Sequence, residues 1–456
     1  MERDALDLGT EHVGRLFRKF FVPTLLGMLS ISAVTVADGI FVGHGVGSDG
    51  IAAINICIPL LMLFTGFGLM VGAGCSVVAS IHLARQQVKA ARINVTQAFL
   101  FVTLVTLVCS ALILSFVRPV ATWLGSSEHL LPMVVDYLWG FVPALVPQMW
   151  VAVGLCVVRL DGAPRLAMWC SVVSALVNVV LDWFFVFPLG WGVFGAALAS
   201  TLAVAIGGII VGVYLFRRAR TLRFYPLKAS RKSLRLTLRN IGYQCRIGAS
   251  AMLGEATMAV LMLTGNLVFM HYLGDDGVGA FGIACYYAPF VFMIGNAVAQ
   301  SAQPIVSFNF GAARLDRVAA VQRVALATAV FCGGSVALAF VGCPQLLVGL
   351  FLPLETVAAR LAVEGFPLFA AGFVCFVVNL AVIGYYQSLE RVRPATVFAL
   401  LRGFFFLVPA FVLLPRLCGT PGMVGYAAFR NDDVLRDRCL LLAVPAADSL
   451  MQKAIV

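Results

Sequence analysis

Eleven long apolar runs, separated by short polar loops, constrain this chain more than any other feature of its sequence. Each run is long enough to cross the hydrocarbon core of a bilayer as a helix, which takes about 20 residues. Continuous apolar runs also exclude an outer-membrane barrel, whose strands alternate over about 10 residues. The pattern predicts an all-α polytopic membrane protein. The runs lie at 16–43, 52–82, 93–117, 131–158, 165–187, 191–215, 241–272, 278–308, 319–343, 360–388 and 395–417.

Composition agrees with a membrane protein. Hydrophobic residues make up 61% of the chain and charged residues only 12%, whereas a soluble domain carries about 25% charged residues. So little charge cannot cover the surface of a water-soluble protein of this size, and a soluble enzyme or a disordered chain is excluded. The histidines and cysteines show no metal-binding spacing, so we expect no resident metal and no cofactor.

The basic residues orient the chain in the membrane. Twenty lysines and arginines fall in five alternate loops, and the intervening loops up to residue 360 carry only Arg118 and Arg360. Since cytoplasmic loops carry the excess of basic residues, we expect the N-terminus and the long 216–246 loop in the cytoplasm. The net charge of +11 is thereby explained by topology, and we expect no nucleic-acid partner.

The two halves of the chain repeat at an offset of 227 residues. The segment 47–51 (GSDGI) aligns with 274–278 (GDDGV), and Gly68 aligns with Gly295. Both copies begin on the predicted cytoplasmic side, so the repeats are parallel, a plan that secondary transporters use. We therefore predict an N-lobe, a basic cytoplasmic linker and a C-lobe, at residues 1–217, 218–240 and 241–456.

Three acidic residues lie deep inside predicted spans: Asp38, Asp182 and Glu255. A charged side chain at the centre of a bilayer costs about 2.5–3.5 kcal/mol on insertion scales, so such residues usually have a function or a partner. A helix rises about 1.5 Å per residue, which places Asp38 roughly 27 Å and Asp182 roughly 24 Å from the cytoplasmic ends of their spans. Their similar depth predicts that these two carboxyl groups can meet.

Further oxygen-bearing side chains accompany this pair. Asn178 precedes Asp182 by four residues and shares its helix face, and Ser200 and Thr201 lie on the following span. Together with Asp38 these residues predict a site for a proton or for a hard cation such as Na⁺. A buried hydrogen-bond cluster with a purely structural role is the alternative.

A second set of polar residues lies in the other half. Glu255 occupies the seventh predicted span, and Gln300, Gln303 and Asn309 flank Pro304 on the eighth. They are candidates for coupling or for substrate contact. For Glu255 the alternative is a carboxylate that snorkels or pairs helices, and for the three amide residues interhelical hydrogen bonding is favoured.

Four features resemble the multidrug and toxic compound extrusion (MATE) family of bacterial efflux transporters. They are the segment 38–43 (DGIFVG), the segment 178–187 (NVVLDWFFVF) with the small residues that follow it up to Thr201, the segment 300–312 (QSAQPIVSFNFGA) and the duplicated layout. The resemblance covers about residues 10 to 420.

The resemblance implies two six-helix lobes and export of amphipathic, often cationic compounds against an inward H⁺ or Na⁺ gradient. It implies that the cation site falls on Asp38, Asn178, Asp182 and Thr201, where Na⁺ is the alternative to a proton. It also implies that Glu255 is a C-lobe acidic residue used by some members, and that Pro23 is a hinge in the first helix.

The C-terminus departs from the family pattern, which has twelve spans. After the eleventh span, the best apolar run is 439–447; it has about nine residues and contains a proline, too few to cross the bilayer. We therefore predict a C-lobe that is incomplete at its last helix.

The favoured function is a cation-coupled multidrug antiporter in the bacterial inner membrane, acting as a monomer on small amphipathic substrates, with H⁺ favoured over Na⁺ as the coupling ion. A flippase for lipid-linked precursors is the first alternative. Such a protein is expected to line its cavity with basic residues, and only Arg402 lies clearly deep in a span. A membrane-embedded enzyme is the second alternative, but the spans show neither a nucleophile with its base nor a metal-ligand pattern, so we expect no enzyme.

Overall fold

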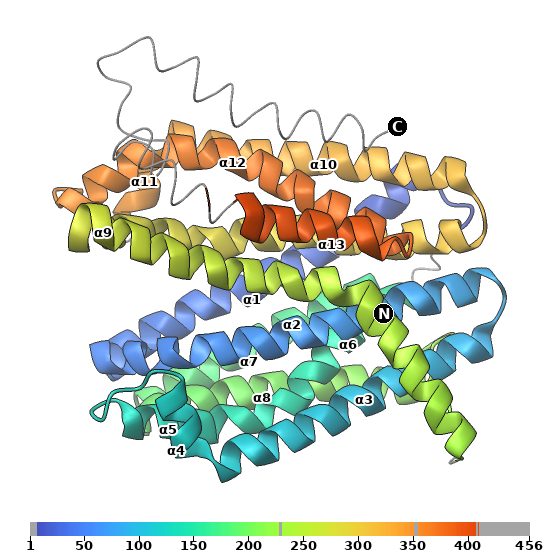
Figure 1. Cartoon of the computed structure of the whole chain (residues 1–456), viewed down its shortest axis with the longest axis horizontal. Coiled ribbons are helices and arrows are strands. Elements are labelled where there is room, and N and C mark those ends of the chain that lie inside the picture. Colours follow the sequence, from blue (N-terminus) through green and yellow to red (C-terminus); the bar gives the residue numbers. More distant parts are fainter. Residues whose placement is uncertain (1–6, 228–229, 351–353, 407–408, 410–456) are drawn as a thin grey trace. The chain divides into compact units, whose positions relative to one another are not determined.

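The computed structural model describes residues 7–227, 230–350, 354–406 and 409, and the described residues form helices and connecting loops (Figure 1). The helices are α1 (Val13–Gly45), α2 (Ser48–Ala84), α3 (Val88–Ser115), α4 (Val117–Trp123), α5 (Leu131–Phe141), η1 (Val142–Ala144), α6 (Leu145–Leu160), α7 (Pro164–Val186), α8 (Gly192–Val213), η2 (Tyr214–Arg218), α9 (Arg231–Gly311), α10 (Leu315–Gly342), α11 (Pro344–Gly349), α12 (Val357–Ser388), α13 (Val392–Leu400) and η3 (Leu401–Phe406).

Ten of the eleven predicted spans have a counterpart in the described part of the chain. Nine helices there are long and apolar enough to cross a membrane, and a bent pair within α12 provides the tenth. The prediction of an all-α polytopic protein is confirmed. The eleventh predicted span, 395–417, begins in α13 and η3 and continues outside the described residues, as does the predicted incomplete C-terminus.

The tenth span is bent, which the hydropathy pattern did not predict. Its two parts, Ala359–Pro367 and Gly372–Ser388, meet at an angle of 61°. Pro367 ends the first part and accounts for the bend, because proline removes one backbone hydrogen bond and its ring clashes with the preceding turn.

The predicted linker 218–240 is helical over its second part. Helix α9 begins at Arg231, where the hydroxyl of Ser230 caps it by accepting a hydrogen bond from the backbone N–H of Ser233 at 3.1 Å. Helical structure then continues to Gly311 through the predicted turn between the seventh and eighth spans. Two separate stretches of α9, Arg231–Tyr272 and Ile283–Gly311, are apolar enough to span a membrane.

The chain divides into two compact units. Unit 1 contains the described residues of Met1–Val260, Ala288–Gly334 and Val374–Gly403, and unit 2 contains those of Leu261–Tyr287, Ser335–Phe373 and Phe404–Val456. The predicted lobe boundaries stay a prediction. Within unit 1, α1 packs against α7, α7 against α8, and α2 against both α3 and α6 (Figure 1).

Helix α2 makes an unusually close crossing with α9 inside unit 1. A Cβ atom added at Gly248 would lie 1.8 Å from the backbone oxygen of Met70, and one added at Gly74 would lie 1.9 Å from that of Gln244. The side-chain amide of Gln303 also donates a hydrogen bond across to α2. Membrane helices pack by such small residues, because lipid tails offer no hydrophobic drive for association.

An aromatic cluster forms the core of unit 2. The ring of Phe340 stacks on Phe366 at 4.7 Å between centroids and meets Phe373 and Tyr287 edge to face at 5.0 and 5.1 Å. The hydroxyl of Tyr287 donates to the backbone oxygen of Leu347 at 3.0 Å. The rings thus bury their faces while the one polar atom keeps a hydrogen bond.

The start of the linker is fastened to unit 1 by one carboxylate. Asp161, at the C-terminal end of α6, is buried and accepts hydrogen bonds from the backbone N–H groups of Arg220, Thr221 and Leu222 at 2.8–2.9 Å. It also accepts from the hydroxyl of Tyr214 at 2.7 Å. From the sequence alone, an acidic residue in a short loop is expected to be exposed to solvent, so this role of Asp161 was not predicted.

Candidate functional site

The structure brings Asp38 and Asp182 together between α1 and α7. The two carboxyl groups lie close enough to interact directly; Asp182 has no exposed surface, and its Oδ1 has no hydrogen-bond partner among the described residues. An ionised carboxylate can only accept hydrogen bonds, so a bond between two carboxyl groups requires one of them to be protonated. This is the meeting that the helix-depth count predicted.

Asn178 joins this pair to α8. With its nitrogen toward α1, the amide donates to Oδ1 of Asp38 at 2.8 Å, while its oxygen accepts from the hydroxyl of Ser200 at 3.1 Å. We assign this orientation from the hydrogen-bond network, because it satisfies both neighbours. Asp38, Asn178, Asp182 and Ser200 therefore form one connected cluster on three helices.

Thr201 contributes differently from the other predicted members. Its hydroxyl donates to the backbone oxygen of Gly140 at 2.6 Å, so its donated bond is directed at α5. Tyr137, also on α5, is buried near both Asp38 and Asp182. Sequence reasoning missed this tyrosine, because one aromatic residue in an apolar run resembles ordinary packing material.

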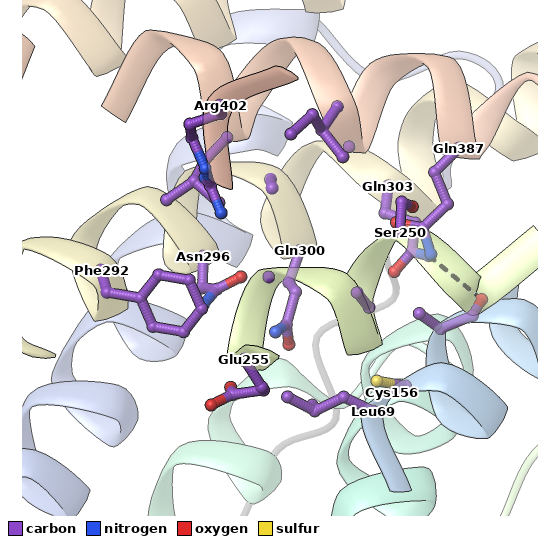
Figure 2. A pocket seen from close by; sticks show the side chains of 17 residues that line it. Leu69, Cys156, Ser250, Glu255, Phe292, Asn296, Gln300, Gln303, Gln387 and Arg402 are labelled. Carbon is purple, nitrogen blue, oxygen red and sulfur yellow. Dashed lines mark hydrogen bonds between the residues drawn. The ribbon is translucent and has the colours of Figure 1, made fainter. Parts of the chain in front are cut away.

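A second polar site occupies a pocket lined by α2, α6, α9, α12 and η3 within unit 1 (Figure 2). Glu255, Gln300 and Gln303 from the sequence prediction all line it. Gln300 accepts a hydrogen bond from Nη2 of Arg159 at 2.5 Å, and Gln303 donates to the backbone oxygen of Ala73 at 3.1 Å. Both amides thus make the interhelical bonds that were favoured for them.

Arg402 is the member of this pocket that sequence reasoning did not place in a site. Figure 2 shows its side chain reaching from η3 into the pocket that Glu255 also lines. The guanidinium carbon lies 4.9 Å from the ring centre of Phe376, in a cation–π contact. Its depth in the membrane was the only signal available from sequence.

The remaining two predicted residues lie apart from the pocket lining. Asn309 is buried; its amide donates to the backbone oxygens of Leu8 and Ile305 at 2.9 and 2.8 Å, and its oxygen accepts from Arg317 at 3.1 Å. It therefore ties the segment before α1 to the end of α9. Pro23 is buried within α1, which is helical on both sides of it.

A helical protein with ten described membrane spans and buried ionisable groups between them has the features of a secondary transporter. The family model MatE matches residues 23–184 and, a second time, residues 251–412. The chain belongs to this family, the multidrug and toxic compound extrusion transporters, and is a transporter rather than an enzyme. The two matches begin 228 residues apart, which agrees with the predicted repeat.

Individual proteins resemble the chain over most of its length. The multidrug export protein MepA of Staphylococcus haemolyticus is 24% identical over 416 residues, which cover 89% of this chain and 88% of that protein. The FAD transporter of Shewanella oneidensis is 22% identical over 320 residues, or 69% of each chain.

A solved structure shares the fold. It is described as the outward-facing conformation of a multidrug resistance MATE family transporter of the MOP superfamily. The two chains superpose with a TM-score of 0.84 at 18% identity, over 93% of this chain and 94% of the other. The predicted MATE fold is thereby confirmed.

Proposed function

We propose that this transporter is a proton-coupled multidrug antiporter that exports amphipathic, often cationic compounds. The observation that carries the proposal is the neighbouring pair of Asp38 and Asp182 between two membrane helices, with Asp182 fully buried and Asp38 bonded to Asn178. Such a pair holds one proton, and its electrostatic energy changes sharply when that proton leaves.

The pair gives proton occupancy a mechanical consequence. With one proton bound, a hydrogen bond links α1 to α7. Without it, two negative charges face each other in a site where Asp182 is fully buried, and like charges repel strongly in such surroundings. A proton therefore favours the arrangement with α1 against α7, which is the differential binding that coupling requires. Pro23 is a suitable hinge for α1, because it interrupts the hydrogen-bond ladder of the helix.

The directions of the donor groups favour a proton over Na⁺. Na⁺ would draw on the oxygens of Asp38, Asn178, Asp182 and Thr201. In the satisfied orientation, however, Asn178 turns its nitrogen toward Asp38 and its oxygen toward Ser200, and the hydroxyl of Thr201 bonds to a backbone oxygen. In that orientation the amide oxygen of Asn178 points away from Asp38, which leaves one oxygen ligand fewer for Na⁺.

The similar proteins support drugs as the favoured class of transported compound. MepA is named a multidrug export protein and aligns with 89% of the chain. The relative named an FAD transporter supports transport of FAD as the alternative. The flippase prediction is less favoured, because among the described pocket-lining residues Arg402 is the one basic side chain.

The decisive experiment is export of a fluorescent cationic dye measured as its uptake into everted vesicles, whose outer surface is the cytoplasmic face, driven by an imposed pH gradient. We expect Asp38→Asn to abolish proton-driven efflux, because an amide cannot exchange the proton. The matched control is Asp49→Asn, the same substitution at a half-exposed carboxylate beside His129, and it should leave efflux unchanged.

A Na⁺ gradient in place of the pH gradient separates the two coupling ions. Efflux that follows Na⁺ and ignores pH would overturn the proton assignment. Efflux that survives Asp38→Asn would show that coupling does not depend on the pair. Efflux driven by neither gradient would favour the FAD-like or lipid-precursor alternative.

The membrane topology and the assembly state are part of the same proposal. We place the N-terminus and the basic loops in the cytoplasm because of the distribution of lysine and arginine, in the inner membrane of a bacterium, with the monomer as the transporting unit. A fusion reporter that is active only outside the cytoplasm, attached before residue 7, should stay inactive.

A further inference from the structure

The side-chain nitrogens of Arg402 are buried in unit 1 without a hydrogen-bond partner among the described residues. This holds for all three of its nitrogens, Nε, Nη1 and Nη2. Its cation–π contact with Phe376 supports the face of the guanidinium, but the N–H groups lie in the plane and keep their need for acceptors. A buried guanidinium in a membrane protein is normally paired with an anion.

Glu255 lies near enough to Arg402 for the two charges to interact, but it accepts no hydrogen bond from the guanidinium. It lines the same pocket, but no ion pair within 4.0 Å joins it to Arg402 in the described part of the chain. Its Oε1 is also buried without a hydrogen-bond partner there. In Figure 2 the two side chains project from different sides of the pocket, with Asn296 and Gln300 lying between them in the view. The pocket thus presents a separated positive and negative group.

Two further polar atoms of the pocket are unpartnered in the described part of the chain. Nε2 of Gln387 and the hydroxyl of Ser250 line the pocket and have no partner among the described residues. Gln300 and Gln303, by contrast, are already engaged with Arg159 and with α2. In Figure 2 Gln387 and Ser250 lie beside Gln303 and away from Arg402, so the unpartnered charged atoms of the pocket are the nitrogens of Arg402 and one carboxylate oxygen of Glu255.

We propose that this pocket binds a zwitterionic group of the transported compound, with a carboxylate at Arg402 and an ammonium at Glu255. The proposal rests on the proposed export function and names its substrate class. A simple cation would leave the guanidinium unpaired and be repelled by it. A simple anion would meet the same difficulty at Glu255. A carboxylate fits the two-pronged donor geometry of arginine.

The test uses purified protein in lipid nanodiscs and two dyes that differ in one group. A rhodamine with a free carboxyl group is a zwitterion, and its methyl ester is the corresponding cation. Fluorescence anisotropy gives the affinity for each dye. We expect the free acid to bind at least about tenfold more tightly than the ester, the contribution expected of one charge-assisted hydrogen bond.

Variants of the pocket locate the effect. Arg402→Gln should remove the preference for the free acid by weakening its binding about tenfold, with the affinity for the ester changed less than about threefold. Arg402→Lys keeps the positive charge but lacks the two-pronged donor, so its preference for the free acid should lie between those of the wild type and of Arg402→Gln. Arg118→Gln, at an exposed arginine on α4, is the matched control.

Arg402→Gln leaves Glu255 as an unbalanced carboxylate and can impair folding. The double variant Arg402→Gln, Glu255→Gln has a neutral pocket, and it should bind both dyes equally. Size-exclusion chromatography shows whether each variant is folded.

The outcomes separate this inference from the proposed function. Equal binding of acid and ester by the wild-type protein overturns the zwitterion site, whatever the transport result, and so does an unchanged preference for the acid in a folded Arg402→Gln protein. If the preference for the acid depends on Arg402 but no ion gradient drives dye transport, the binding site stands and proton-coupled export fails.

Discussion

Asp161 offers the sharpest test of the structure, because one side chain satisfies four donors. Removing it with Asp161→Ala leaves the N–H of Leu222 and the hydroxyl of Tyr214, both buried, without this acceptor. Each buried unsatisfied donor costs about 1–3 kcal/mol, so we expect a loss of about 2–6 kcal/mol. The N–H of Arg220, an exposed residue, can turn to water and adds little.

Asp161→Asn should cost less, about 1–2 kcal/mol. The amide oxygen can still accept from the N–H groups of Thr221 and Leu222, and the tyrosine hydroxyl can accept from the new NH₂ group. The bond that is lost is the one from Arg220, which water replaces. The expected order of stability is therefore wild type, asparagine, alanine.

The assay is the free energy of unfolding in mixed micelles, titrated with a denaturing detergent. Glu128→Gln, at an exposed loop carboxylate, is the control and should stay within about 0.5 kcal/mol of wild type. A protease that cuts within 219–227 should cleave the alanine variant faster. The reasoning is refuted if Asp161→Ala unfolds at the same detergent concentration as the control.

Two further predictions concern other parts of unit 1. Gly248→Ala should disrupt folding, because its Cβ would lie 1.8 Å from the backbone oxygen of Met70. Gly242→Ala, where nothing lies within 4 Å, should be tolerated. The measurements are the yield of each variant in the membrane and its elution profile in size-exclusion chromatography, and equal results for the two variants would contradict the close crossing. The hydrogen bond from the Thr10 hydroxyl holds the pKa of Asp7 below its ordinary value, so the carboxylate stabilises its turn above the unfolded-state pKa of about 4. That stabilisation is lost as the pH falls through the lower folded-state pKa, and the anisotropy of an N-terminal fluorophore should drop there; a constant anisotropy down to that pH would contradict the prediction.

Hydropathy and the positions of charged residues were sufficient to predict the membrane spans and one part of the candidate site from the sequence. Asp38 and Asp182 could be paired from sequence because a helix has a fixed rise, so residue counts convert to depth. The same count cannot show which faces of two helices meet. Arg402 and Glu255 were both recognised as deep, but nothing in the sequence places them in one pocket.

Other features depended on local chemistry that a single sequence leaves ambiguous. Ser230 could have been read as a helix cap, since serine before a helix is a known signal, and that would have shortened the predicted linker. The bend at Pro367 was readable in principle, but membrane helices tolerate proline without breaking. The role of Asp161 depends on a loop about 60 residues further along the chain, beyond any local pattern.

The fastened linker has a consequence for how the protein can be divided. Asp161 binds the start of the linker, and the backbone N–H of Tyr225 donates to the hydroxyl of Thr96 at 2.9 Å. The side-chain amide of Gln97 binds the first turns of α9: it donates to the hydroxyl of Thr237 at 2.8 Å and accepts from the amide of Asn240 at 3.1 Å. A linker that is hydrogen-bonded at both ends does not act as a flexible connection between the two halves of the sequence. Two fragments expressed separately, broken between Tyr225 and Ser230, should therefore reassemble into a working transporter, with helix contacts doing the joining that the peptide bond normally does.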